Sequence, residues 1–209
     1  MKVALDFEDF YAQRSGVMPA ASDDLLVLTT DGKGIVMHSE DLRAATAQAA
    51  QKASSSRQTR LSPGQKRQRK RMATVASVYS VPRSKRRPED IIGDQRDPPE
   101  RPAIHDKRVW ASVRHDAKTV INSAFDEARL RDPQSQREWV IQVDGEPHQL
   151  IPIEASAKQR DINVTIVLDF IHVLEYIWKA AFCFFPSGSE AAEAWVQERA
   201  LLILQWICQ

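Results

Sequence analysis

The sequence has few of the residues that stabilise small disulfide-rich or zinc-bound domains. Only two cysteines occur in 209 residues, Cys183 and Cys208, and no second pair accompanies them. Two cysteines 25 positions apart form neither a disulfide framework nor a set of four zinc ligands. We therefore expect a protein of a reducing, intracellular compartment.

Long apolar runs and a basic leader are also absent. No apolar run approaches the roughly 18–20 residues that a membrane-spanning helix needs. The segment Met1–Asp9 carries acids where a secretory signal peptide would carry positive charges. We expect a cytoplasmic protein with no membrane partner. The sequence also lacks the G-x-x-x-x-G-K-[ST] pattern of a nucleotide-hydrolysing phosphate loop.

Acidic residues are absent from the whole segment Leu42–Pro88, although the chain has 28 Asp+Glu and a net charge of only +1. This segment of 47 residues holds 13 of the 29 Lys+Arg, so the rest of the chain has 16 basic and 28 acidic residues, a net of −12. A block of this kind is typical of a surface that binds polyanions, because cations that contact phosphate release condensed counterions.

Double-stranded DNA is the polyanion that we expect at this basic segment, 42–88. Aromatic residues are scarce there, with only Tyr79 nearby, so stacking on single-stranded bases is not indicated. A solvated basic helix or a disordered arm without a ligand is the alternative. The residues that we expect to contact DNA phosphates are Arg57, Arg60, Lys66, Arg67, Arg69, Lys70 and Arg71.

Alternating strand and helix patterns predict an α/β fold with a mixed sheet. The apolar run Leu25–Thr30 stops before two glycines and resumes at Ile35–His38, which predicts a hairpin turning at Gly32 and Gly34. Five of the 11 prolines lie in Pro82–Pro102, which predicts an exposed, semi-rigid connector. The other predicted strands are Thr74–Val81, Glu138–Val143 and Asn163–Leu168, and the predicted helices are Leu42–Ala53, a basic helix from Ser62–Pro63, Ser112–Arg131, Ile153–Arg160, a buried helix Phe170–Phe182, and a last helix running toward Trp206.

Three predicted strands are each followed by an aspartate: Asp31, Asp144 and Asp169. In an open α/β sheet the carboxyl ends of the strands meet at one edge, where ligands bind. Carboxylate oxygens are preferred ligands of Mg²⁺, and paired ions promote in-line attack on a phosphodiester. Aspartates are also common in turns, so each one alone is weak evidence for a metal site.

Two other interpretations of these residues stay open. Thr29-Thr30-Asp31-Gly32 resembles the loop of aspartyl-nucleophile phosphatases, but that loop has a second aspartate at the position of Thr29. His172 lies three residues before Glu175 on the helix after Asp169. A lone histidine on an apolar helix is more often a hydrogen-bonded core or supporting group than a ligand or catalyst.

Four blocks taken together resemble the DDE transposases of the ISKra group of bacterial insertion sequences. They are LLVLTTDGKGIVM at Leu25–Met37, SPGQKRQRKRMATVASVYSV at Ser62–Val81, WVIQVDGEPHQ at Trp139–Gln149, and the long block at Val164–Val196 that includes DFIHVLEYIW. The resemblance implies a ribonuclease-H-like core with a mixed five-stranded sheet, followed by a C-terminal helical segment. It also implies a DNA-cutting and DNA-joining activity that uses carboxylates and Mg²⁺ or Mn²⁺.

The same resemblance implies roles for particular residues. Asp31 on the first strand and Asp144 on the fourth match the first two catalytic, metal-binding carboxylates. Asp169 and His172 are expected to be structural or to support the site. The expected partners are transposon-end DNA and a second or intact transposase chain, with a bacterial cytoplasmic location at the nucleoid when DNA is bound.

The resemblance also implies that the chain is a truncated copy. Residues 1–24 would be a linker or a truncated N-terminal region, residues 25–175 the catalytic core, and residues 176–209 the start of a helical insertion. No glutamate occupies the place of the family's third carboxylate. A fragment without nuclease activity is therefore expected, and a non-catalytic DNA-binding remnant that uses only its basic segment is the alternative.

Overall fold

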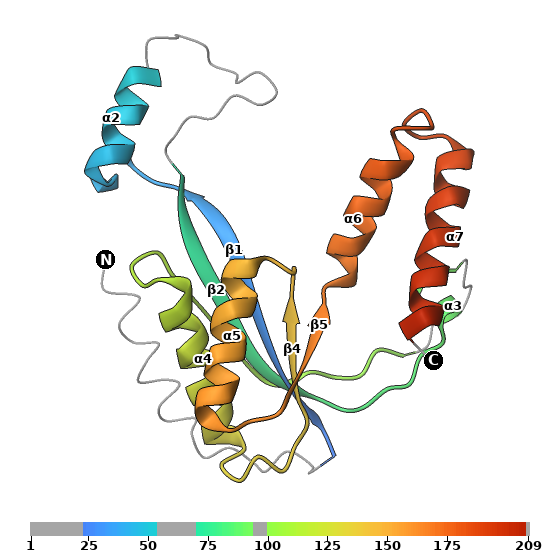
Figure 1. The fold of residues 1–209 in the computed structure, drawn as a ribbon, viewed down its shortest axis with the longest axis horizontal. Helices are drawn as coiled ribbons and strands as arrows, with labels where there is room; N and C mark the ends of the chain where they lie inside the picture. The colour runs from blue at the N-terminus through green and yellow to red at the C-terminus, as the bar shows by residue number, and fades with distance from the viewer. Residues whose placement is uncertain (1–22, 54–69, 94–99, 208–209) are drawn as a thin grey trace.

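The computed structural model of the protein describes residues 23–53, 70–93 and 100–207. Its five strands form one sheet in the order β3-β2-β1-β4-β5 (Figure 1). β1 (Leu25–Val36), β2 (Lys70–Val81) and β3 (His105–Ser112) are antiparallel neighbours, and β4 (Trp139–Val143) and β5 (Val164–Leu168) run parallel to β1. The helices are the 3-10 turn η1 (Ser39–Asp41), α2 (Ala44–Ala53), α3 (Pro88–Ile91), α4 (Ala117–Arg131), α5 (Pro147–Arg160), α6 (Phe170–Ala181) and α7 (Glu190–Ile207).

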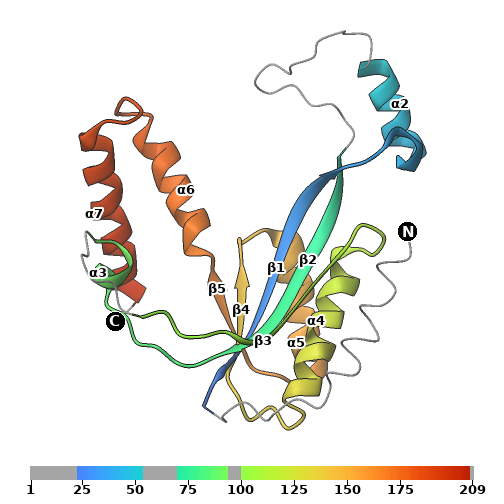
Figure 2. The same cartoon turned by 180° about the vertical axis from the view of Figure 1, so that it is seen from behind.

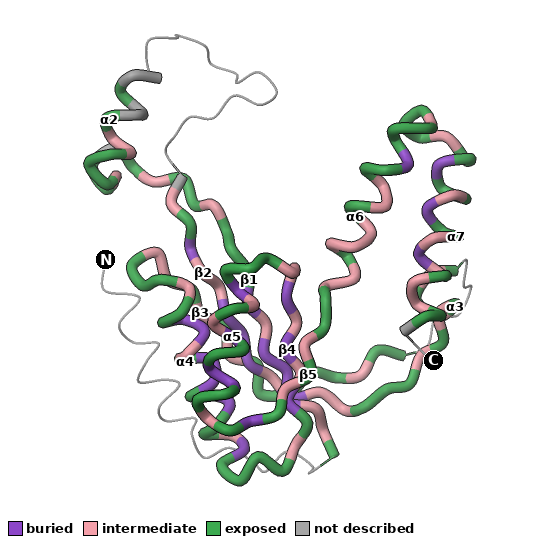
Figure 3. Tube along the Cα trace, viewed as in Figure 1, coloured by how far each residue is buried: buried purple, intermediate pink, exposed green. Residues whose placement is uncertain are grey.

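The core lies between the sheet and the helices α4 and α5, which cover one face of it (Figures 1 and 3). Alternate residues of β1 and β4 point into this core, as the period of two in a strand requires. Full burial of an aliphatic or aromatic side chain contributes about 1.5–3 kcal/mol. The largest fully buried side chains are those of Trp139, Phe125, Leu26, Leu28, Ile121, Ile141 and Ile153.

The predicted α/β class, the mixed five-stranded sheet and the C-terminal helices are confirmed. The strands predicted at Thr74–Val81, Glu138–Val143 and Asn163–Leu168 correspond to β2, β4 and β5, with small changes at their ends. Helix α4 begins at Ala117, five residues after its predicted start, because Asp116 caps it by accepting a hydrogen bond from Thr119 N. Helix α5 is longer than predicted and begins at Pro147.

The hairpin predicted at Gly32 and Gly34 is wrong. β1 runs without interruption from Leu25 to Val36 and pairs with β2 along its whole length. Neither glycine has the positive φ that tight two-residue hairpin turns require. Gly32 instead makes room for a neighbour, because a Cβ there would lie 3.3 Å from the Cε of Met72.

β3 is a strand that the sequence does not predict. Its residues alternate only weakly, and a bulge interrupts its pairing with β2 between Val78 and Ser80. Asp106 and Lys107 there stand opposite the single residue Tyr79, and Asp106 has a φ of 50°. Residues 94–99 of the predicted connector 82–102, and the basic helix predicted from Ser62, lie outside the described residues, while α3 forms within that connector.

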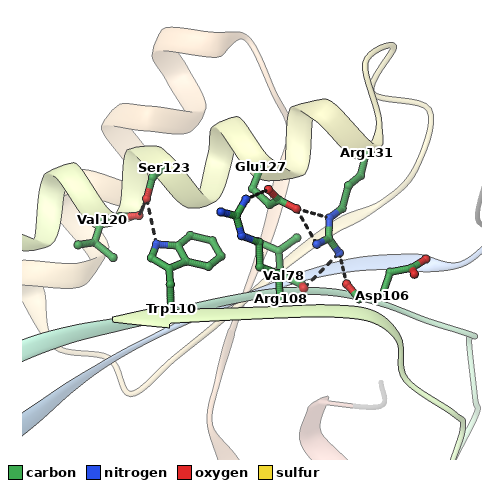
Figure 4. A network of polar contacts seen from close by, with 8 residues as sticks. All are labelled: Val78, Asp106, Arg108, Trp110, Val120, Ser123, Glu127 and Arg131. Atoms are coloured by element: carbon green, nitrogen blue, oxygen red, sulfur yellow. Dashed lines mark hydrogen bonds and ion pairs between the residues drawn. The ribbon is translucent and has the colours of Figure 1, made fainter. Parts of the chain in front are cut away.

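A charged network fastens α4 over this bulge (Figure 4). Arg131 donates hydrogen bonds to the carbonyl oxygens of Val78 (3.2 Å) and Asp106 (2.5 Å). Glu127 accepts from Arg131 on one carboxylate oxygen and from Arg108 on the other. The guanidinium group of Arg131 therefore binds carbonyl groups at the point where the strand register shifts, and α4 is fixed in place on β2 and β3.

The helix α6 was predicted to be buried, and this prediction is wrong. Of its residues only Ala181 is buried, whereas Ile171 and Tyr176 are 67% and 65% exposed. α6 packs along α7 as a helical hairpin that extends away from the sheet (Figures 1 and 2). An apolar stripe shows that one face of a helix can be covered, but it does not show that the same domain covers it.

Candidate functional site

Asp31 and Asp144 lie on adjacent parallel strands at matching positions. β1 and β4 are paired from Leu26 opposite Trp139 to Thr29 opposite Gln142. Asp31 and Asp144 each follow that last pair by two residues, beyond the paired segment of the two strands. The two aspartates that the sequence assigns to the catalytic site therefore come from adjacent strands, at the same end of the parallel part of the sheet.

Both aspartates belong to the face of the sheet opposite α4 and α5, which we call the distal face. Thr30, just before Asp31, is buried on the helix-covered face, where its Oγ1 lies 3.4 Å from Oε1 of Gln149 on α5. Val143, just before Asp144, is 1% exposed in the core. Successive residues of a strand alternate between faces, so Asp31 and Asp144 both belong to the distal face.

Asp169 continues the same row onto β5. Val143 pairs with Leu168, so Asp169 stands next to Asp144, and its amide N–H donates to the carbonyl of Val143 at 2.7 Å. Its carboxylate caps α6 by accepting a hydrogen bond from Ile171 N at 2.9 Å. The side chain thus has a structural role as a helix cap, and a structural or supporting role is what the resemblance implies for Asp169.

The two other carboxylates differ in their surroundings. Asp144 Oδ1 accepts a hydrogen bond from Glu146 N at 3.0 Å, which forms a turn between β4 and α5. Asp31 is exposed and lies in the middle of β1, not at its end as predicted. Its carboxylate makes no hydrogen bond or ion pair with another described residue.

Within the described ranges, no three His, Cys, Asp or Glu residues come together as a possible metal site. The row of aspartates therefore offers two carboxylates from adjacent strands, while the third, Asp169, caps its own helix. A pair suits Mg²⁺, which is commonly held by one or two carboxylates together with water and substrate phosphate oxygens.

Gly145 shapes the turn that follows Asp144. Its φ is 91°, a backbone conformation that L side chains rarely adopt, and a Cβ there would lie 3.1 Å from Cδ2 of Leu168. β4 and β5 consequently stay close together where Asp144 and Asp169 stand. Sequence reasoning assigned no role to this glycine, although its position directly after a strand-end aspartate is a signal of a tight turn.

Polar pairs hold β1 just before Asp31. Thr29 Oγ1 and Ser77 Oγ are hydrogen-bonded at 2.7 Å across β1 and β2 on the distal face. Thr30 and Gln149 meet on the other face. The backbone that carries Asp31 is thus fixed from β2 and from α5. Of the four residues in these two pairs, Ser77 and Gln149 lie far from Asp31 in the sequence, so local sequence alone does not connect them to it.

The predicted DNA-binding residues are only partly described. Arg57, Arg60, Lys66, Arg67 and Arg69 lie outside the described residues, and Lys70 and Arg71 begin β2. Arg71 pairs with Ile35 at the far end of β1. Its Nε is buried and has no hydrogen-bond partner among the described residues.

His172 and Glu175 form a surface group on α6. Nδ1 of His172 lies 3.8 Å from Oε2 of Glu175, and Nζ of Lys179 lies 3.9 Å from the same oxygen. All three side chains are 40–66% exposed. Pairs this exposed contribute little to stability. This group therefore needs no role beyond that of a solvated helix surface.

No protein-family model, curated protein or solved structure matches this chain. None of the helices in the part of the chain that the structure describes is long and apolar enough to span a membrane.

Proposed function

We infer that this chain is a DNA-processing domain of the DDE transposase type, with Asp31 and Asp144 as its metal-binding carboxylates. The observation that carries this proposal is that Asp31 and Asp144 come from adjacent parallel strands and belong to the same, distal face of the sheet. The resemblance assigns these carboxylates to the first and fourth strands, and β1 and β4 are neighbours in the observed sheet. The sheet is compatible with a ribonuclease-H-like core.

Mg²⁺ or Mn²⁺ bound there would activate a nucleophile and stabilise the leaving oxygen of a phosphodiester. Asp31 has no partner among the described residues, so its carboxylate is available for a cation. Asp144 keeps one oxygen on Glu146 N, which fixes the orientation of the carboxylate and leaves Oδ2 for a second ligand bond. The protein thus supplies one oriented acid, Asp144, and one acid without a described partner, Asp31, and leaves the remaining ligand positions to water and phosphate oxygens.

A non-catalytic DNA-binding protein is the second candidate. Ligand number fixes both the occupancy and the geometry of a metal site. Because no group of three possible metal ligands occurs among the described residues, cleavage would be weak even if DNA is bound. In this candidate function the basic segment 42–88 holds transposon-end DNA or assists an intact transposase chain.

A nicking and strand-transfer assay with Mg²⁺ and Mn²⁺ distinguishes the two functions. The DNA-processing function requires metal-dependent product from the parent chain and loss of that product in Asp31→Asn and Asp144→Asn. Asp161→Asn is the matched control, because Asp161 is an exposed residue that ends α5 before β5 begins, at the opposite end of these parallel strands from Asp144. DNA binding without any metal-dependent product would favour the second candidate. Turnover of a small phosphate ester without DNA would instead indicate a phosphatase based on Asp31.

A further inference from the structure

β1 and β2 continue beyond the other strands as a two-stranded ribbon. β4 pairs with β1 only as far as Thr29, and β3 pairs with β2 only from Thr74 onward. The pairs from Lys33 opposite Ala73 to Val36 opposite Lys70 therefore have no third strand beside them among the described residues. Figures 1 and 2 both show this ribbon projecting from the sheet toward α2.

Lys33 and Arg71 occupy the same face of the ribbon. Lys33 lies opposite Ala73, and Arg71 lies opposite Ile35. Directly opposite residues of an antiparallel pair share a face, and diagonal neighbours such as Lys33 and Arg71 are about 7–8 Å apart. Lys33 follows Asp31 by two residues, so both cations belong to the distal face, which also carries the two aspartates.

These two cations are not neutralised within the described part of the chain. Lys33 is exposed, and neither Lys33 nor Arg71 forms an ion pair there. The buried Nε of Arg71 lacks an acceptor among the described residues. A phosphate group of a bound polyanion would balance the positive charges of Lys33 and Arg71.

The rest of the ribbon is apolar, exposed and thin. Ile35, Met72 and Val36 are 41%, 63% and 66% exposed, and Gly34 has no side chain. A two-stranded ribbon fits the major groove of B-form DNA, which is about 12 Å wide. It does not fit the deep, narrow major groove of A-form RNA. The dimensions of the ribbon therefore favour duplex DNA over duplex RNA.

We propose that the ribbon of Lys33–Val36 and Lys70–Ala73 lies in the major groove of duplex DNA, with Lys33 and Arg71 on phosphates. The same duplex then continues across the distal face toward Asp31 and Asp144. This inference rests on the proposed function for the identification of the polyanion as DNA. The way in which the protein binds that DNA is inferred from the ribbon alone.

Fluorescence anisotropy with a short labelled DNA duplex, in EDTA and at several salt concentrations, tests the phosphate contacts. The double variant Lys33→Gln/Arg71→Gln is expected to flatten the slope of log K against log salt by about 1.8, from about 0.9 for each lost phosphate contact. The matched control Lys118→Gln/Lys158→Gln removes two exposed charges from α4 and α5 and should leave the slope unchanged. An unchanged slope in the ribbon variant, or an equal change in the control, overturns the proposal. Lys33→Gln alone, at an exposed side chain, answers the question if the double variant does not fold.

Competition with groove-specific DNA ligands tests which groove the ribbon occupies. Methyl green, a major-groove ligand, should displace the protein, whereas netropsin, a minor-groove ligand, should not. Duplex RNA of the same sequence should bind at least about tenfold more weakly, because its major groove is closed to a ribbon. Equal binding of RNA, or displacement by netropsin alone, overturns the placement in the major groove. Binding is measured in EDTA, so it does not depend on a metal. If the parent chain binds DNA through the ribbon but gives no metal-dependent nicking in the assay above, only the proposed cleavage function is refuted.

Discussion

Trp139 Nε1 donates a hydrogen bond of 2.9 Å to Oδ2 of Asp132, and both side chains are buried. The same carboxylate accepts from the backbone N–H groups of Gln136 and Arg137, each at 3.0 Å. Arg137 in turn donates to the carbonyl oxygens of Asp24 and Leu25 at 3.0 Å. One buried carboxylate thus joins the end of α4 to the starts of β4 and β1, at the opposite end of the sheet from Asp31.

Asp132→Asn should lower the free energy of unfolding at neutral pH. It should also make that free energy depend less on pH in the acid range. Burial opposes the ionisation of Asp132, but the hydrogen bonds from Trp139, Gln136 and Arg137 and the charge of Arg137 outweigh it and lower the pKa of the carboxyl below 3.8. A lowered pKa contributes stability that is fully present above the pKa of the unfolded chain and is lost as the pH falls through the folded value. We expect the variant to lose about 2 kcal/mol at neutral pH.

Urea denaturation followed by tryptophan fluorescence, from neutral pH to below about pH 4, measures this effect. Glu154→Gln, at an exposed position of α5, is the control and should follow the wild-type pH dependence. Equal slopes of stability against pH for wild type and Asp132→Asn would show that the carboxylate is not held in its charged form.

Gly145→Ala should be more destabilising than Gly188→Ala. Both glycines have a positive φ, 91° and 77°, so both variants lose about 1–2 kcal/mol to backbone strain. Only Gly145 has a neighbour in the way, Cδ2 of Leu168 at 3.1 Å, whereas a Cβ at Gly188 meets nothing within 4 Å. The difference between the two melting temperatures isolates the contact between the β4 turn and β5. Identical losses would mean that Leu168 moves away without cost.

Glu127→Gln should destabilise the protein by about 3 kcal/mol, because it leaves Arg131 and Arg108 without the charge that they share. The side chains of Glu127 and Arg131 are only 13% and 7% exposed. Glu175→Gln removes a carboxylate from the exposed pairs on α6 and should change stability by less than about 1 kcal/mol. Chemical denaturation of both variants measures the contrast, and a similar loss in the two would place the Arg131 network among weak surface pairs.

Asp169→Ala and Asp169→Ser separate capping from metal binding. Serine keeps an oxygen for Ile171 N and alanine does not, so only the alanine variant should lose about 1 kcal/mol. Any metal-dependent nicking by the parent chain should survive in Asp169→Ser, since the role that we assign to this side chain is the cap. Loss of nicking with unchanged stability in Asp169→Ser would assign Asp169 to the metal site instead.

The sequence predicts the candidate site only as well as it predicts where the strands end. β4 and β5 are short apolar runs that stop at Asp144 and Asp169, and the structure ends both strands there. Asp31 belongs to the first strand, as predicted, but it lies inside that strand and not at its end. The prediction failed because the two glycines that follow Asp31 resemble a turn. Pairing with β2, which joins Leu25 to Val81 and Val36 to Lys70, decides that β1 continues, and that information is not local.

Other features depend on tertiary packing in the same way. β3 follows the antiparallel register that β2 offers, although its own sequence pattern is weak. The exposure of Ile171 and Tyr176 follows from the direction in which α6 leaves the sheet. The face shared by Lys33, Arg71 and the aspartates emerges only when the register of three strands is known.

The bulge under Arg131 also bears on how the chain avoids aggregation. β3 and β5 are the two outer strands, and outer strands carry unpaired backbone groups that can recruit another copy. On β3 the left-handed residue Asp106 breaks the flat run of such groups, and β5 is only five residues long. Both borders of the sheet are therefore poor templates for intermolecular strand addition.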